Sequence, residues 1–193
     1  MDIMFAGHFG LAAGVRSKVP EIPLWALMLG TQLLDVVFVP LYLTGIEPID
    51  TQLGSGYGKG IIHADYSHSL LGAMIIAVLA GLFARKLWGG KAGFVLSAVV
   101  FSHWLLDLVV HRADLPLLPG NWGDFSLLGL GAWRSEGLSI GLELLILVVG
   151  FAMYVRTSLR KAGGTRLRVA VSSCVVLGIM LGFALITDIT SLF

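Results

Sequence analysis

The chain has 193 residues, of which 56% are hydrophobic and 13% are charged, and its formal net charge is +1. Soluble domains carry about 25% charged residues, and nucleic-acid-binding domains carry strongly basic surfaces, so this composition argues against both classes. It predicts an integral membrane protein that forms a single domain over residues 1–193. The one cysteine, Cys174, excludes an intrachain disulfide.

Six apolar segments predict an all-α fold, a polytopic transmembrane helical bundle with five or six membrane segments. The first, residues 3–15, rises only about 20 Å as a helix, whereas the hydrocarbon core is about 30 Å thick. It can cross a locally thinned bilayer or lie partly inserted. The other five predicted segments are residues 22–44, 70–87, 92–110, 137–155 and 169–189.

Most basic residues fall in short clusters between the apolar segments. Ten of the 13 lie within residues 16–18, 85–91 and 156–168. If these clusters are cytoplasmic, the positive-inside rule places the loop 112–136 and the C-terminus outside. The predicted location is the prokaryotic cytoplasmic membrane, with the candidate site described next toward the outer face.

Residues 102–111, SHWLLDLVVH, place His103, Asp107 and His111 four residues apart in an apolar segment. Residues at i, i+4 and i+8 share one face of a helix. An ionised carboxylate at the bilayer centre costs about 2.5–3.5 kcal/mol on insertion scales, so we expect this face to point inward. Asp35 is a second acid inside an apolar segment.

The five histidines all lie in or beside short motifs, and most converge with the two acids on one half of the membrane. Imidazole nitrogen and carboxylate oxygen are zinc ligands, and a catalytic zinc site keeps one position open for water. A divalent ion would also offset the charges of Asp35 and Asp107. Asp65 or Glu143 can orient a ligand histidine from behind.

Each of these residues also has a simpler interpretation. His8 alone fits a helix contact, Asp35 a hydrogen bond between helices, and His63 a solvated loop position. His103 and Asp107 can form one hydrogen-bonded pair. As a set, the residues favour metal binding. Three others have a peripheral interpretation: His111 as an orienting or interfacial residue, and Cys174 and Asp188 as structural.

Five short motifs resemble the YdjM-like family of membrane-bound metal-dependent hydrolases, which is grouped with zinc-dependent phospholipases C and zinc nucleases. The motifs are GHFGLAAG (residues 7–14), LLD (33–35), HADYSHS (63–69), SHWLLD (102–107) and LPLLPG (115–120). The resemblance implies these metal ligands: His8, Asp35, His63, His68, His103 and Asp107. The chain departs from the family pattern where Leu34 replaces a proline, Val37 replaces a second acid, and Ala64 and Asp65 replace arginine and glycine.

The predicted function is a membrane-bound hydrolase with one to three divalent ions, zinc being the expected metal. Asp35 is the candidate catalytic residue, as a base or as a bridging ligand. A site sunk in the membrane favours a phosphoester of a lipid or lipid-linked substrate, so the expected partners are membrane lipids and not nucleic acid. The alternatives are a proton- or metal-ion-coupled transporter and a haem-binding subunit with two facing histidines.

Overall fold

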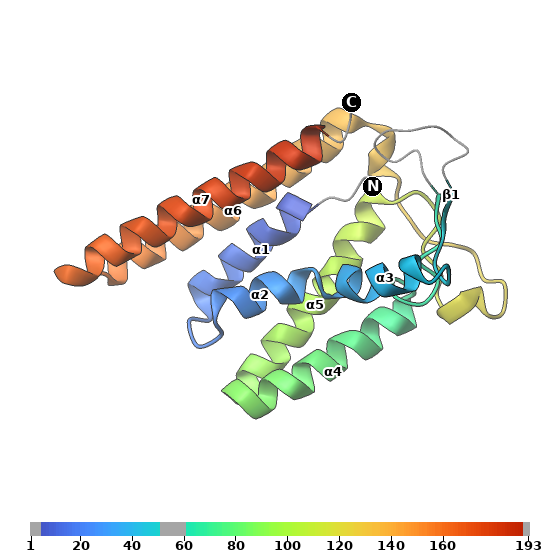
Figure 1. Cartoon of the computed structure of the whole chain (residues 1–193), viewed down its shortest axis with the longest axis horizontal. Coiled ribbons are helices and arrows are strands. Elements are labelled where there is room, and N and C mark those ends of the chain that lie inside the picture. The colour runs from blue at the N-terminus through green and yellow to red at the C-terminus, as the bar shows by residue number, and fades with distance from the viewer. Residues whose placement is uncertain (1–4, 51–60, 191–193) are drawn as a thin grey trace.

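The computed structural model describes residues 5–50 and 61–190, and this part of the chain is mainly helical (Figure 1). Its seven α-helices are α1 (Phe5–Lys18), α2 (Leu24–Thr31), α3 (Leu33–Leu43), α4 (Leu70–Trp88), α5 (Gly90–Val110), α6 (Glu136–Lys161) and α7 (Thr165–Thr190). Two short strands, β1 (Ile49–Asp50) and β2 (Ile61–Ile62), pair antiparallel. Two 3-10 turns, η1 (Pro119–Asn121) and η2 (Ala132–Arg134), lie between α5 and α6. The predicted all-α class is confirmed.

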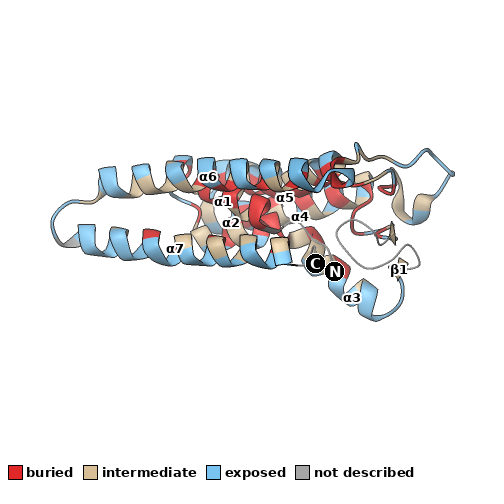
Figure 2. Cartoon of the chain, turned by 90° about the horizontal axis from the view of Figure 1, so that it is seen from above, coloured by how far each residue is buried: buried red, intermediate tan, exposed pale blue. Residues whose placement is uncertain are grey.

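Within the described residues, α4, α5, α6 and α7 are long and apolar enough to cross a membrane. The pair α2 and α3 makes a fifth crossing if it is counted as one bent span. Large apolar side chains such as Phe83, Ile179 and Phe183 are 63–68% exposed on the outer faces. Such faces suit contact with lipid. Figure 2 shows this pattern on α6 and α7, whose residues are mostly exposed. The predicted polytopic bundle is confirmed.

The predicted segment 22–44 is two helices, which bend by 49° on either side of Gln32. Gln32 has φ −114° and ψ 7°, outside the usual helical values. The Thr31 hydroxyl donates a hydrogen bond back to the carbonyl of Met28, a contact that tends to bend helices. The break places Asp35 in the first turn of α3.

Helix α1 is short but enclosed, with α6 and α7 packed against it. The amide of Ala6 donates to Oδ2 of Asp188 on α7 at 2.8 Å, and the amide of Gly7 donates to Oε1 of Glu143 on α6 at 3.5 Å. These carboxylates satisfy amides that a helix leaves without an internal partner and favour its positive end. Asp188 therefore has the structural role expected from the sequence.

The turns that join α1 to α2, α4 to α5 and α6 to α7 all lie at the end of the molecule on the left of Figure 1. They carry the three basic clusters. An ion pair at this end, Lys91 Nζ to Glu21 Oε1 at 2.8 Å, links the first two turns. The hydrogen bond from Lys91 lowers the pKa of Glu21. The opposite end holds the β-hairpin and the long loop between α5 and α6.

Helices α1 and α6 approach closely at Gly10, and this contact yields a stability prediction. A Cβ atom at Gly10 would lie 2.5 Å from Cα of Leu147, whereas one at Gly14 would lie 3.4 Å from Cα of Gly150. We expect Gly10→Ala to lower the free energy of unfolding by about 1–3 kcal/mol through overpacking. Gly14→Ala, the matched control, should be neutral or slightly stabilising because alanine favours helix. Thermal unfolding in detergent compares the two variants, and equal melting temperatures would contradict this packing.

Candidate metal centre

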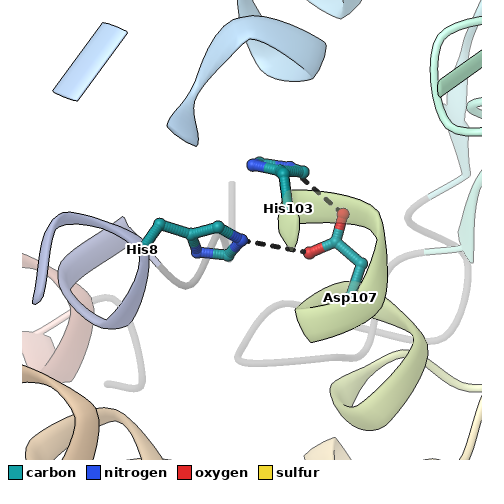
Figure 3. A group of neighbouring side chains, drawn as sticks. All are labelled: His8, His103 and Asp107. Carbon is teal, nitrogen blue, oxygen red and sulfur yellow. Dashed lines mark ion pairs between the residues drawn. The ribbon is translucent and has the colours of Figure 1, made fainter. Parts of the chain in front are cut away.

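Five of the six predicted ligands converge inside the bundle, at the end opposite the basic turns. They are His8 on α1, Asp35 on α3, His68 just before α4, and His103 and Asp107 on α5. They form two groups that share His103: His8, His103 and Asp107, and Asp35, His68 and His103. In each group the candidate ligand atoms lie within 4.8 Å of one another. Figure 3 shows the first group, with His8 facing Asp107 across the space between α1 and α5.

The distances between these atoms match the spacing of ligands around one ion. Nε2 of His103 lies 3.1 Å from Oδ2 of Asp107 and 3.6 Å from Oδ2 of Asp35. Nε2 of His68 lies 3.4 Å from Oδ1 of Asp35 and 3.3 Å from Nε2 of His103. Tetrahedral ligands at about 2.0–2.1 Å from zinc are about 3.4 Å apart. The buried histidines and aspartates can therefore hold a metal ion.

The tautomer of neutral His103 follows from its contact with the bend between α2 and α3. Nδ1 of His103 lies 2.6 Å from the carbonyl oxygen of Thr31. A carbonyl oxygen only accepts, so Nδ1 must carry the proton. Nε2 of the neutral ring then presents its lone pair to Asp35 and Asp107, which is the arrangement that metal-ligating histidines adopt.

A chain of hydrogen bonds fixes His68 in the same way. The Ser67 hydroxyl donates to Oε2 of Glu47 at 2.8 Å, and its oxygen lies 2.8 Å from Nδ1 of His68. Since the hydroxyl proton points to Glu47, the Ser67 oxygen must accept from Nδ1–H of His68. Nε2 of a neutral His68 therefore also carries a lone pair that faces the centre. The indole of Trp104 donates to the His68 carbonyl at 2.8 Å and holds the backbone.

The Asp107 carboxylate connects the two groups. Its Oδ2 faces His103, and also His68 at 3.6 Å, while its Oδ1 faces Nε2 of His8 at 3.7 Å. Asp107 and His103 lie on one face of α5 because they are four residues apart. The rings of His8 and His103 pack with their centroids 4.2 Å apart. A bridging carboxylate of this kind can serve two ions or orient the ligands of one.

The structure places the other predicted histidines elsewhere. His63 is exposed and belongs to neither group of candidate ligands among the described residues. His111 ends α5 with Nδ1 2.9 Å from Oδ1 of Asp114, and its ring packs on Trp133. Asp65, predicted to orient a ligand, is half-buried, and burial raises its pKa.

Sequence reasoning missed Glu47, which lies behind His68. Its side chain is fully buried and accepts hydrogen bonds from the amides of Tyr66 and Ser67, at 2.6 and 2.8 Å, and from the Ser67 hydroxyl. Glu47 lies in a polar connection, where no helical spacing relates it to the ligands. The only sequence signal was the residue type, because an acidic side chain that is buried next to an apolar segment needs hydrogen-bond donors.

The hydrogen bonds behind His68 generate a prediction for Glu47→Gln. An amide NH₂ in place of Oε2 would donate to the Ser67 oxygen, so the hydroxyl would turn and donate to Nδ1 of His68. The proton of the neutral ring would then move to Nε2, which could no longer ligate. We expect zinc affinity, measured by competition with a chelator, to fall about 10–100-fold. Asp65→Asn is the matched control, and an equal loss in both variants would contradict this role of Glu47.

No family model, curated protein or solved structure matches this chain. The chemistry of the centre is therefore inferred from its own side chains. Four features define it: two histidines held with Nε2 toward the centre, a third histidine 3.7 Å from Asp107, two carboxylates and an almost complete exclusion of solvent.

Proposed function

We propose that the chain is a membrane-bound, metal-dependent hydrolase that cleaves a phosphoester of a lipid or lipid-linked substrate. The observation that carries the proposal is the convergence of the Nε2 atoms of His68 and His103 on Asp35 and Asp107. The side chains of His68, His103 and Asp107 are 1–8% exposed, and that of Asp35 is 13% exposed. The resemblance of the short motifs to the YdjM-like family supports the same class.

The charge balance of the centre favours a divalent cation. With neutral histidines, Asp35 and Asp107 place two negative charges in a site that excludes most water, and burying unpaired charges costs several kcal/mol. Zinc suits the mixture of imidazole nitrogen and carboxylate oxygen. His68, His103 and Asp107 would hold one ion and leave a position open for water beside Asp35. Nε2 of His103 has a single lone pair and can bind only one ion. A second ion would therefore use His8 and the second oxygen of Asp107.

A divalent ion held there would supply a Lewis acid for the phosphoryl oxygen and lower the pKa of a nearby water toward about 7. Asp35 is the residue best placed to take the proton of the attacking water. Its Oδ2 is buried and makes no hydrogen bond among the described residues. Its side chain is 13% exposed, more than those of His8, His68, His103 and Asp107, so a substrate would meet it first.

The depth of the centre favours a lipid phosphoester. His68 lies two residues before α4, and Asp107 lies three residues, or about 5 Å, before the end of α5. With α4 and α5 crossing the membrane, this level would lie near the phosphoester groups of lipids. Val36 and Val39, on the same helix as Asp35, are exposed and suit contact with acyl chains. With the basic turns in the cytoplasm, the centre would face the outer side of a prokaryotic cytoplasmic membrane.

Metal content tests the centre itself. We expect purified protein without a histidine tag to contain one or two zinc ions per chain by elemental mass spectrometry. His103→Ala should lose at least one ion because it removes a candidate ligand common to both groups, and His8→Ala should lose at most one. His63→Ala, an exposed histidine outside the centre, is the matched control and should keep the full content. A folded, metal-free wild type would remove the hydrolase proposal.

Hydrolysis tests the reaction and its substrate class. We expect the zinc-loaded protein to release phosphate or a phosphorylated headgroup from lipid phosphoesters in mixed micelles. Asp35→Asn should lower kcat about 10²–10⁴-fold, the usual contribution of a general base, and His63→Ala should leave kcat unchanged. The readout is product release across matched lipid and soluble phosphoesters. A soluble phosphoester as the best substrate would contradict the lipid assignment, and full activity in Asp35→Asn would contradict the role of Asp35.

A further inference from the structure

We propose that the loop between α5 and α6 forms a second site, a pocket that binds the phosphate group of an anionic lipid. A cavity of about 220 Å³ lies beside the end of α5 and is lined by Arg112, Gly131, Trp133 and Arg134. These residues are distinct from the candidate metal ligands. The inference goes beyond the proposed function and does not depend on it.

The two arginines give the pocket its chemistry. In the described part of the chain, neither guanidinium forms an ion pair or a side-chain hydrogen bond. Two like charges on one small cavity repel each other, and a phosphate placed between them offsets both. The planar fork of arginine donors matches the oxygens of a phosphate, which it can bind through two parallel hydrogen bonds.

The floor of the pocket is held in place by backbone contacts. The amide of Gly131 donates to the carbonyl of His111 at 2.7 Å, and the amide of Leu130 donates to the carbonyl of Leu108 at 2.8 Å. Gly131 has φ 76°, a left-handed value that favours glycine. A Cβ atom there would lie 3.3 Å from Nε of Arg134, so the side chain of Arg134 lies over this glycine.

The aromatic wall is equally fixed. Trp133 is 7% exposed, and its ring lies 4.1 Å from that of His111, which Asp114 holds through Nδ1. The hydroxyl of Ser139, in the second turn of α6, donates to the carbonyl of Ala132 at 3.0 Å. The pocket therefore exists before a ligand arrives, which lowers the entropy lost on binding.

The surroundings favour a lipid over free phosphate. The pocket lies where α5 ends and α6 begins, so it would lie near the lipid headgroups when these helices cross the membrane. Next to it, Leu130 is 75% exposed and Leu138 53% exposed, so apolar surface for acyl chains adjoins the two arginines. The ten basic residues of the three turns lie at the opposite end of the bundle, so the positive-inside rule does not account for Arg112 and Arg134.

Native mass spectrometry of the full chain in detergent tests the pocket. We expect phosphatidic acid to bind more tightly than phosphatidylcholine with the same acyl chains. Replacing both arginines, R112Q/R134Q, should weaken phosphatidic acid binding at least tenfold, about the value of one charge-assisted hydrogen bond. Arg160→Gln, which changes an exposed arginine at the other end of α6, is the matched control and should bind normally.

Two further measurements separate the possible outcomes. Inorganic phosphate that displaces the lipid at equal concentration would overturn the lipid assignment in favour of free phosphate. Unchanged binding by the double variant, or the same loss in Arg160→Gln, would overturn the pocket. His103→Ala should keep lipid binding while it loses metal, so the metal centre and the pocket fail independently. Circular dichroism of the double variant verifies its fold, and Arg134→Lys should lose less affinity than Arg134→Gln.

Discussion

The burial of two carboxylates among apolar helices is the constraint on which the rest of this structure depends. Asp35 and Asp107 lie where water is nearly excluded, and an unpaired charge there costs several kcal/mol. Three histidines lie close to these carboxylates: His8 on α1, His68 just before α4 and His103 on α5. The bend at Gln32 serves the same arrangement, because it exposes the Thr31 carbonyl to His103 and starts α3 just before Asp35.

Part of this arrangement was predictable from spacing alone. His103 and Asp107 are four residues apart in an apolar helix, and helical geometry requires that they share a face. The spans were predictable too, because length and hydropathy suffice to define them. His63 and His68 are five residues apart, a spacing that does not share one helix face, and the structure brings only His68 to the centre.

The remainder depended on tertiary contacts that no local pattern encodes. Hydropathy is continuous across residues 22–44, so the break at Gln32 gave no signal. Glu47 orients His68 only through Ser67, a relation that appears once the connection before β1 folds back onto the start of α4. Glu143 looked like an orienting acid for a ligand, yet it accepts from the amide of Gly7 at the start of α1. Long-range hydrogen bonds of this kind determine which buried acid orients a candidate ligand and which one caps a helix.

The cap on α1 has a consequence for the order of assembly. The Ala6 amide and its Asp188 acceptor are separated by 182 positions, so α1 can make this contact only after α7 has been synthesised. His8 lies two residues after Ala6, in the helix that this contact anchors. The remaining four candidate ligands lie at or before residue 107, whereas Asp188, the acceptor that anchors the helix of His8, lies on α7. The contact that anchors the helix of His8 therefore depends on α7, which follows all the other candidate ligands in the chain.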